Sequence, residues 1–359
     1  MPRIFLESHN INNLFFGLGQ FNKQLIEALQ NVVHEEQVNL DITITSKKTT
    51  VFSEAVLKHF TFKKYSSLYR KPLFRIRKKY DLWHSLNQNT KIEPYHNLPY
   101  LLTIHDVNFM EEMTGEALEK KIQLFKTKLN RSTAITYISN YAKDMTHKYF
   151  TVPDVNEYVI YNGSEKIVHQ LEENYKPTVE IDGPYLFFIG EFLEKKNIHT
   201  LIELLPHLPN YKLVLAGKNT TEYANVCRKL ISDLQLEDRV IIPGKINEMD
   251  KYYYYKNCSA FVFPSLREGF GLPPIEAMQF GTPVFLSNKS ALPEVGGKHA
   301  YYWDHFDAKY MAETISTQLN AFNADKENKQ LALKKYANAF LWEKTAKAYL
   351  DVYKSLVFK

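Results

Sequence analysis

Two hydrophobic patterns alternate along the chain. Short apolar runs, which predict buried strands, are separated by stretches with apolar residues at helical spacing, as over residues 18–33. In the first half the predicted strands are residues 4–6, 38–44, 80–85, 99–105 and 134–139, with a last strand and turn over 159–163. In the second half they are residues 185–190, 212–216, 240–242, 260–263, 284–286 and 301–303. This alternation predicts α/β units around parallel sheets.

The stretch 259–283 predicts a strand, a glycine-bearing loop and a helix. An apolar run, residues 260–263, predicts the buried strand. The glycine-bearing loop that follows includes residues 268–272. Pro273 and Pro274 then open the helix, a position that suits proline. The amides at such a helix start have no partner within the helix, so they can attract a phosphate group.

Two carboxylates, Glu268 and Glu276, bracket this loop eight residues apart. A carboxylate accepts several hydrogen bonds, so each could hold a pair of neighbouring sugar hydroxyls. For either glutamate alone, a structural role is the better explanation: Glu276 complements the helix dipole, and Glu268 is a solvated loop charge. Two of them around one glycine loop favour a site for a sugar joined to a phosphate.

This stretch resembles the E-x7-E signature of retaining glycosyltransferases of family 4, within the glycosyl transferases group 1. The likeness continues through AMQFGTPV after Glu276 and ALPEV at residues 291–295. The resemblance implies the GT-B fold: two facing Rossmann-like domains with parallel sheets, and a C-terminal helix that crosses back to the first domain. It implies a hexosyltransferase that moves a sugar from a nucleotide-diphosphate sugar to a glycan or lipid-linked acceptor, in surface polysaccharide or lipopolysaccharide synthesis. The ALPEV and I-H-D forms favour mannosyltransferase-like members, with GDP-mannose as donor.

The domain organisation follows from length and resemblance together. A chain of 359 residues favours two domains over one large core. We expect an N-terminal acceptor-binding Rossmann-like domain over 1–165, a polar linker over 166–183, a nucleotide-sugar-binding Rossmann-like domain over 184–340, and a crossover helix over 341–359. The last of these has an apolar stripe at helical spacing.

The resemblance assigns roles on the donor side. Glu276 would hold the ribose hydroxyls, Glu268 the donor sugar, and Lys196 the diphosphate, with Lys195 assisting. Further expected donor-binding residues are Gly269, Phe270, Gly271, Leu272, Ser139 and Gly190. Glu191 stands where many members have arginine. Since a carboxylate cannot bind phosphate in that way, either Lys195 substitutes or phosphate binding is weaker.

On the first domain, Gly17 and Gly19 precede a helix and His105 follows a buried strand. The glycines suit a phosphate or acceptor loop and an ordinary turn about equally, and the resemblance favours the loop. Residue 22 is asparagine, so the third glycine of a dehydrogenase fingerprint is missing. A structural role would be the default for His105, but the IHDVNF sequence resembles a motif whose histidine contacts the donor sugar. We therefore group it with Glu268 and Lys196 as catalytic. Ser139 is explained more simply as a helix N-cap.

Composition and motifs bear on the cellular compartment and on the need for a metal. Cys227 and Cys258 lack metal-ligand spacing and suit a reducing cytosol, and neither a signal peptide nor a membrane-spanning stretch is visible. There is no Asp-x-Asp metal motif, so we expect no cofactor and no metal if lysine and amides stabilise the diphosphate. The expected location is the cytoplasm, with peripheral association at the inner face of the membrane.

The stretch 58–80 contains nine Lys/Arg residues among aromatics and no acidic residue. It could dock on anionic lipid headgroups, bind nucleic acid, or form a solvated basic face. The resemblance to enzymes acting on lipid-linked acceptors favours the membrane, and nucleic acid is the weakest option. Three alternatives for the whole protein stay open: a transferase that uses UDP or another nucleotide, a GT-B-fold nucleotide-sugar epimerase, and an inactive sugar-nucleotide-binding protein, at which Glu191 hints.

Overall fold

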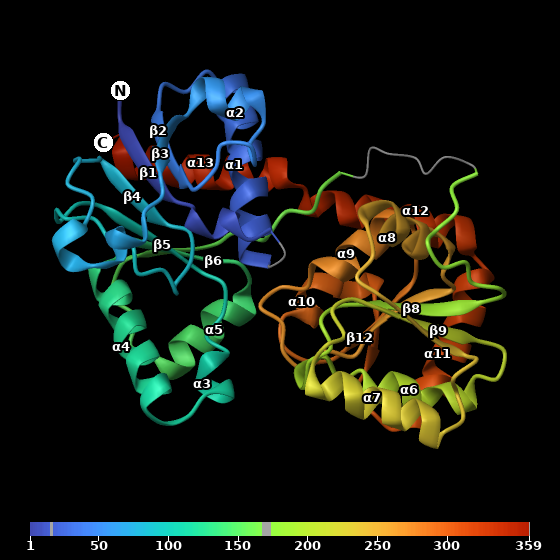
Figure 1. Cartoon of the computed structure of the whole chain (residues 1–359). Helices are drawn as coiled ribbons and strands as arrows, with labels where there is room; N and C mark the ends of the chain where they lie inside the picture. The colour runs from blue at the N-terminus through green and yellow to red at the C-terminus, as the bar shows by residue number, and fades with distance from the viewer. Residues whose placement is uncertain (15–16, 167–173, 359) are drawn as a thin grey trace. The chain divides into compact units, whose positions relative to one another are not determined.

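The computed structural model describes residues 1–14, 17–166 and 174–358 (Figure 1). They form two compact units, the first comprising Met1–Glu165 with Phe340–Lys359 and the second Lys166–Ala339. Within the predicted linker 166–183, residues 167–173 lie outside the described part of the chain. Each unit is built on its own parallel sheet.

The first unit has a sheet of seven parallel strands in the order β3-β2-β1-β4-β5-β6-β7. Its strands are β1 Arg3–Glu7, β2 Asp41–Ser46, β3 Thr61–Lys64, β4 Leu82–Ser85, β5 Tyr100–Ile104, β6 Ala134–Tyr137 and β7 Asn156–Val159. Its helices are α1 Gly17–Glu35, α2 Glu54–His59, α3 Phe109–Glu112, α4 Gly115–Arg131, α5 Asn140–Tyr149 and α13 Trp342–Val357. Short 3-10 turns are η1 His9–Asn12, η2 Ser67–Arg70, η3 Pro72–Phe74 and, where the chain returns to this unit, η7 Asn338–Phe340.

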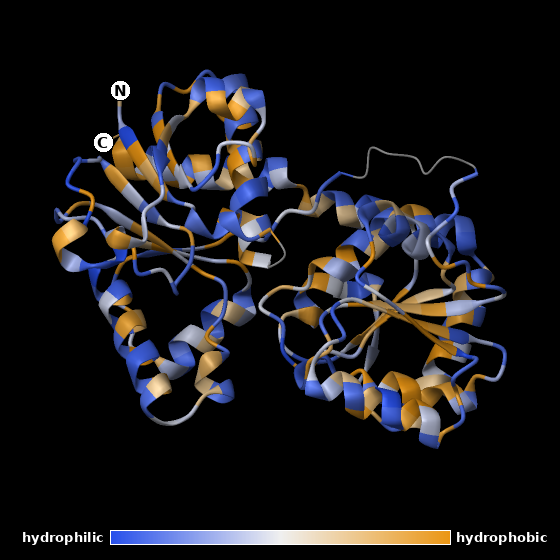
Figure 2. Cartoon of the chain, in the orientation of Figure 1, coloured by the Kyte–Doolittle hydropathy of each residue, from blue (hydrophilic) through white to orange (hydrophobic). Residues whose placement is uncertain are grey.

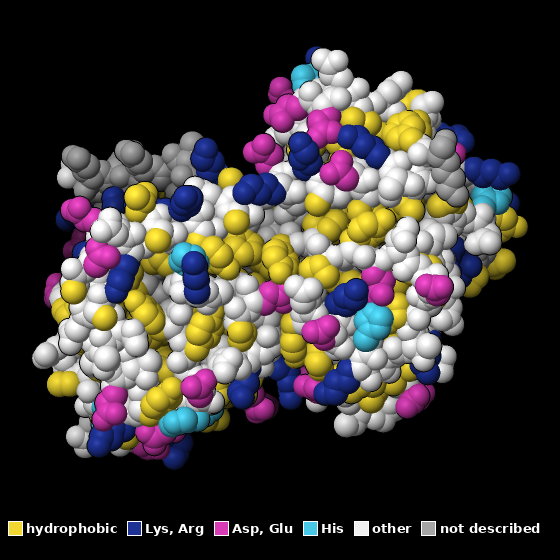
Figure 3. Space-filling model, turned by 180° about the vertical axis from the view of Figure 1, so that it is seen from behind, with side chains coloured by type: hydrophobic (Ala, Val, Ile, Leu, Met, Phe, Trp, Pro, Cys, Tyr) yellow, Lys and Arg dark blue, Asp and Glu magenta, His cyan; other side chains and the backbone are white. Residues whose placement is uncertain are grey.

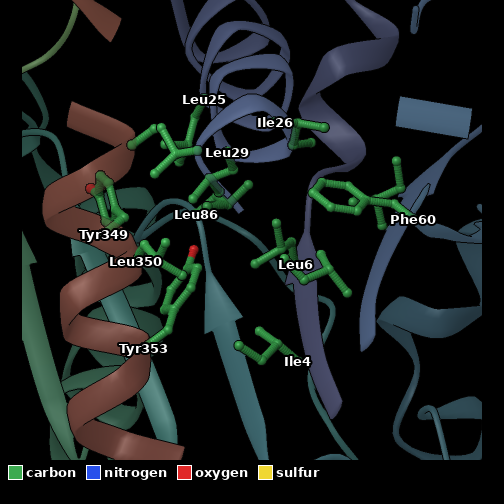
Figure 4. Close-up of a cluster of buried hydrophobic side chains, with 14 of the residues drawn as sticks. Ile4, Leu6, Leu25, Ile26, Leu29, Phe60, Leu86, Tyr349, Leu350 and Tyr353 are labelled. Atoms are coloured by element: carbon green, nitrogen blue, oxygen red, sulfur yellow. The ribbon is translucent and has the colours of Figure 1, made fainter. Parts of the chain in front are cut away.

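The last helix, α13, belongs to the first unit although the second unit precedes it in sequence. Its apolar stripe packs against α1 and the centre of the sheet. Figure 4 shows Leu25 and Leu29 of α1 gathered with Tyr349 and Tyr353 of α13 in one buried cluster. The predicted C-terminal helix that crosses back to the first domain is thereby confirmed.

The second unit has a sheet of six parallel strands in the order β10-β9-β8-β11-β12-β13. Its strands are β8 Tyr185–Ile189, β9 Lys212–Ala216, β10 Val240–Gly244, β11 Ala260–Phe263, β12 Val284–Ser287 and β13 Tyr301–Trp303. Its helices are α6 His199–Leu204, α7 Glu222–Asp233, α8 Glu248–Asn257, α9 Leu272–Gln279, α10 Leu292–Gly296, α11 Ala308–Asn323 and α12 Lys326–Ala337. The 3-10 turns are η4 Glu194–Lys196, η5 Leu205–His207 and η6 Gly297–His299.

Local sequence signals explain where these elements begin. Side-chain oxygens of Ser139, Thr221, Asn247 and Asp307 accept hydrogen bonds from backbone amides in the first turns of α5, α7, α8 and α11. The central strands are buried along their length, and in the second unit they are the most hydrophobic part of Figure 2. Such runs are expected for parallel strands covered on both faces.

The basic stretch 58–80 contains more structure than its composition suggested. Residues Thr61–Lys64 form the edge strand β3, and η2 and η3 follow it. Elsewhere charges of both signs mix, as on the face in Figure 3, where Lys and Arg are interspersed with Asp and Glu. Within the described residues, no helix is both long enough and apolar enough to cross a membrane.

Candidate active site

The strand order of the second unit reverses direction between β8 and β11, which are hydrogen-bonded neighbours. Loops that leave the carboxyl ends of two such strands diverge, and in open α/β sheets ligands bind in the crevice between them. The loop after β8 carries Gly190, Glu191, Lys195 and Lys196, and the loop after β11 carries Glu268. The predicted donor-side residues Gly190, Lys195, Lys196 and Glu268 therefore lie in the two loops at this reversal of strand order, whereas Ser139 lies in the first unit.

An ion pair joins these two loops. Nζ of Lys196 donates to Oε1 of Glu268 at 2.5 Å, and each side chain is 15% exposed. The same ammonium lies 5.0 Å from the ring centroid of Phe263, at the end of β11. The backbone amide of Glu268 donates to Oγ of Ser290 at 3.0 Å, and this hydrogen bond fixes the backbone of Glu268. Charge of both signs is thus held in one largely buried place.

Backbone contacts hold the two loops in register. The carbonyl of Lys195 accepts from the amide of Leu266 at 2.8 Å and from Oγ of Ser265 at 3.1 Å. Ser287, at the end of β12, donates in turn to the carbonyl of Ser265. Lys195 therefore helps to fix the position of its neighbour Lys196 through its own backbone.

The start of α9 offers fewer amides than an ordinary helix. Gly271 is the N-cap, with φ of 110°, a left-handed conformation that suits glycine. Pro273 and Pro274 follow Leu272 and have no N–H. Of the amides that a helix start usually leaves unpaired, those of Gly271 and Leu272 therefore remain for an anion. Phe270 beside them is buried, and Gly269 is partly exposed.

Glu276 has a different environment from Glu268. Its Oε2 accepts from the hydroxyl of Tyr255 at 2.9 Å, and its Oε1 accepts from Nζ of Lys251 at 3.3 Å. Both partners lie on α8, four residues apart, and so share a face of that helix. An ionised carboxylate has about four lone-pair positions. Two positions of Glu276 therefore stay available for a pair of ligand hydroxyls.

The protonation states of its partners suit that role. Burial alone would lower the pKa of Lys251, but the carboxylates of Glu276 and Glu248 outweigh burial and raise it. Burial, followed by the charge of Glu276, raises the pKa of Tyr255 well above 10. Lys251 is therefore cationic and Tyr255 a neutral hydrogen-bond donor at neutral pH, and both hold the Glu276 carboxyl group in place.

Close packing surrounds Gly190. The amide of Gly190 donates to the carbonyl of Ala216 at 3.0 Å, and Gly217, with φ of 129°, approaches the Gly190 carbonyl too closely to allow a side chain. Glu191, which stands where many family members have arginine, pairs with Lys218 at 2.6 Å. The carboxylate of Glu191 thus has a cationic partner from the loop after β9.

In the first unit the strand order reverses between β1 and β4. His105, directly after β5, is buried near this point, and its Nε2 lies 2.9 Å from the carbonyl of Leu86, just after β4. Its ring meets that of Phe21 on α1 edge-on, with centroids 4.6 Å apart. His105 therefore occupies the position in its own sheet that ligands favour in such folds.

The contact to Leu86 decides how His105 can act. Burial lowers the pKa of His105, although the Leu86 carbonyl and Asp106 oppose the shift. The ring is therefore neutral at neutral pH, and since a carbonyl only accepts, Nε2 carries the proton. Nδ1 is then an acceptor, to which no described residue donates. His105 can accept a hydrogen bond from a ligand hydroxyl at Nδ1, whereas donation from Nε2 to a ligand would require that the contact with Leu86 be broken.

The other first-unit candidates have structural explanations. Gly17 begins α1 with open space around it, whereas a side chain on Gly19 would clash with the carbonyl of Asn13. Residues 15–16, in the same predicted phosphate or acceptor loop, lie outside the described part of the chain. Ser139 caps α5, accepting from the amide of Ala142 at 3.0 Å, as its simpler explanation predicted. Among the residues the structure describes, no group of three or more His, Cys, Asp or Glu side chains could hold a metal ion.

Comparison with known sequences finds a similar family. Residues 172–340, which span nearly all of the second unit, match the model described as glycosyl transferases group 1. The chain is 28% identical over 240 residues to the O-antigen chain mannosyltransferase RfbU of Salmonella typhimurium, covering 64% of each chain. It is 32% identical over 180 residues to O-antigen chain mannosyltransferase B of Escherichia coli, covering 48% of this chain and 46% of that one. The matches thus cover less than two thirds of each of these relatives.

Solved structures resemble the chain over almost its whole length. A glycosyltransferase from Rickettsia africae gives a TM-score of 0.75 at 17% identity, covering 99% of this chain and 98% of that one. Sucrose-phosphate synthase from Thermosynechococcus elongatus gives a TM-score of 0.72 at 19% identity, covering 99% of both. These likenesses and the two parallel sheets confirm the predicted GT-B fold, whose two domains are Rossmann-like.

Sequence reasoning missed several residues that support the candidate site. Tyr255 and Lys251 lie at i and i+4 spacing on a helix, but nothing in the sequence indicates that this face meets Glu276. Ser290 immediately precedes the ALPEV stretch, and that position could have drawn attention to it. The partner of Glu191, Lys218, carried no signal beyond its place after a strand.

Proposed function

We propose that this protein is a retaining glycosyltransferase that moves mannose from GDP-mannose to a glycan or lipid-linked acceptor in surface polysaccharide or lipopolysaccharide synthesis. The observation that carries the proposal is the Lys196–Glu268 pair at the reversal of strand order, beside the amides of Gly271 and Leu272. Relatives named as O-antigen mannosyltransferases support mannose as the sugar.

The donor is held by the second unit in this proposal. Glu276 binds the ribose diol with its two remaining lone-pair positions, while Tyr255 and Lys251 hold the carboxylate in place. Glu268 binds hydroxyls of the transferred sugar. The two glutamates share no partner among the described residues, which supports separate roles for them.

The diphosphate leaves with growing negative charge. Lys196 has three N–H donors, of which one serves Glu268, so the others are available to phosphate oxygens. The amides of Gly271 and Leu272 add fixed dipoles at the start of α9. Electrostatic stabilisation by preorganised groups of this kind is usually the largest single contribution to catalysis. We propose that they act without a metal ion, and that the leaving phosphate takes the acceptor's proton in a front-face reaction.

The first unit supplies the acceptor side. His105, neutral and protonated at Nε2, presents Nδ1 to a sugar hydroxyl, and its contacts with Leu86 and Phe21 fix the plane of the ring. It thus orients a hydroxyl near the reacting centre and carries no charge of its own. Gly17 and Gly19, at the start of α1, mark the loop that we assign to the acceptor or its phosphate.

Membrane association is part of the proposal. Between η2 and the end of η3, Leu73 is 82% exposed and Phe74 is 48% exposed, and basic residues surround them in sequence. Exposed apolar side chains among cations suit an anionic bilayer surface, where each cation contributes about 1 kcal/mol. This part of the basic stretch 58–80 would bring the enzyme to lipid-linked acceptors.

A second candidate is a protein that binds sugar nucleotides without turnover, favoured by Glu191 at the usual arginine position. The test is a thermal-shift series with GDP, UDP, ADP, CMP, dTDP and their sugars in EDTA, followed by a transfer assay. Ligand at 100 times its Kd stabilises by about 2.7 kcal/mol. GDP should give the largest shift without metal, and GDP-mannose should be turned over only with acceptor present. Binding without turnover favours the second candidate, turnover of the donor alone an epimerase, and a larger shift with UDP a different donor.

A further inference from the structure

The first unit contains a cavity of about 500 Å³. It is bounded by η2 and η3, by residues 91–97 and by the last turns of α4. Its charged and titratable lining consists of Arg70, Arg75, Lys91, Glu93, Tyr95, His96, Lys128 and Arg131. Five cationic side chains and a single carboxylate make this lining strongly basic.

The cavity is separate from the candidate active site. Residues 91–97 come just before β5, and α4 ends at Arg131 just before β6, so both segments lie at the amino edge of the parallel sheet. His105 follows the carboxyl end of β5, at the opposite edge. A ligand in this cavity would therefore not occupy the place assigned to donor or acceptor sugars.

The single carboxylate of the lining, Glu93, forms ion pairs with two cations. Lys128, 1% exposed, donates to Oε1 of Glu93 at 2.5 Å and to the hydroxyl of Tyr100 at 2.9 Å. Arg131 donates to the other carboxylate oxygen of Glu93 at 2.7 Å. Burial raises the pKa of Tyr100 to about 12, so its hydroxyl stays protonated. The inner wall of the cavity is thus a fixed, buried and net cationic network.

The remaining cations of the cavity have no such partner. Among the described residues, no carboxylate lies within ion-pairing distance of Arg70, Arg75 or Lys91. Arg70 lies over the ring of Tyr65 at 5.9 Å from its centroid, a contact that leaves its N–H groups free. Arg70 and Lys91 are exposed to solvent and Arg75 is partly exposed, so all three cations are open to an anion that enters the cavity.

We propose that this cavity binds a phosphate group. Guanidinium groups match phosphate oxygens in pairs, and lysine adds a point charge. The volume is ample for a phosphate with a substituent. The phosphate is either part of a lipid headgroup or carried by a soluble molecule. The exposed Leu73 and Phe74, between Arg70 and Arg75 in sequence, favour the lipid. This inference does not depend on the proposed glycosyl transfer.

The test compares two doubly substituted full-length chains of equal charge. One carries Arg75→Gln and Lys91→Gln, and the control carries Lys58→Gln and Lys79→Gln, which lie outside the cavity. All chains also carry Lys196→Ala, which weakens anion binding at the donor site equally in each of them. Binding of inorganic phosphate is measured by thermal shift against sodium chloride of equal ionic strength. Binding to phosphatidylcholine vesicles, with or without phosphatidylglycerol, is measured by co-sedimentation.

We expect the cavity substitutions to weaken binding about tenfold and the control substitutions to change it less than threefold. If this holds for free phosphate, a soluble phosphate suffices as ligand. If it holds only for vesicles with phosphatidylglycerol, the phosphate belongs to a lipid. Equal losses in both chains, or no binding of either probe by the unsubstituted cavity, overturn the proposal. Unchanged melting temperatures without ligand confirm that the substitutions leave the fold intact.

Discussion

Lys196 and Glu268 are 72 residues apart in sequence, and their charged groups lie 2.5 Å apart at the ends of two adjacent strands. Each neutralises the other in a place that is mostly shielded from water. In the proposed mechanism the ion pair holds the lysine in place for the diphosphate. Less free energy is then spent in ordering the lysine side chain when the donor binds.

Glu268→Gln should lower kcat for glycosyl transfer by about 10²–10³-fold, because a neutral amide replaces the carboxylate that pairs with Lys196 and that we propose to bind the donor sugar. The shape of the side chain is kept, so the circular dichroism spectrum should not change. Glu268→Ala should abolish transfer. Initial rates with purified donor and acceptor test this prediction. A wild-type kcat in Glu268→Gln would contradict the proposed role of Glu268 in transfer.

Lys196→Ala should cost about 2 kcal/mol of unfolding free energy, because Glu268 then stays largely buried without its cation. It should also weaken nucleotide binding. The double variant Lys196→Ala, Glu268→Ala should recover part of the stability and none of the nucleotide affinity. Urea unfolding and calorimetric titration separate these effects. Wild-type nucleotide affinity in Lys196→Ala would show that the lysine serves only the ion pair.

Tyr255→Phe should raise the KM for the donor about fivefold, since the hydroxyl that orients Glu276 is lost at a cost of about 1 kcal/mol. Glu276→Ala should raise it further, while the KM for the acceptor changes little in either variant. Tyr253→Phe, on the same helix but without contact to Glu276, is the matched control. Equal changes in both KM values would place Glu276 outside the ribose site.

Glu191→Gln should tighten nucleotide-diphosphate binding by less than tenfold. The substitution removes a negative charge from the phosphate-side loop and frees Lys218 from its partner. The effect is limited because both side chains are partly exposed to solvent. Glu191→Arg should have a larger effect in the same direction. Calorimetric titration gives the affinities, and weaker binding in both variants would mean that Glu191 supports the loop.

Stability should fall on acidification because of His84. This residue is fully buried between Tyr353 and Thr103, and burial, with a smaller contribution from His105, lowers its pKa from 6.5 to about 3. The unfolded chain therefore takes up a proton first, so the stability present above pH 6.5 is lost as pH falls toward 3. The slope approaches about 1.4 kcal/mol per pH unit for one proton. Urea titrations at several pH values should give a smaller slope for His84→Gln, and equal slopes would contradict the assignment.

Hydrophobic pattern was sufficient to find most strands. The bounds of β9, β11 and β13 agree with the prediction, because buried parallel strands are continuous apolar runs with sharp ends. β3, at Thr61–Lys64, was missed because an edge strand exposed at both ends keeps polar residues. β2 begins at Asp41, later than predicted, because pairing with β1 begins at that residue and Val38 and Leu40 lie before it. β7 ends where the predicted strand and turn 159–163 begins.

The candidate site was less accessible to sequence reasoning. Glu268 and Glu276 were recognisable because a single strand–loop–helix carries both. The contact of Lys196 with Glu268 depends on which strands are neighbours, and this order is not encoded locally. The hydrogen bond from His105 to Leu86 has the same origin, since it joins loops after β4 and β5. Only the structure could therefore show that Nδ1 of His105 is left to accept.

The place of α13 also bears on how the protein is made. Residues Trp342, Tyr349 and Tyr353 complete the core of the first unit, whose remaining parts leave the ribosome far earlier. The second unit is one continuous segment and holds all its strands by Trp303. During synthesis, the apolar face of the first unit that α13 covers therefore stays uncovered until the whole second unit has been made.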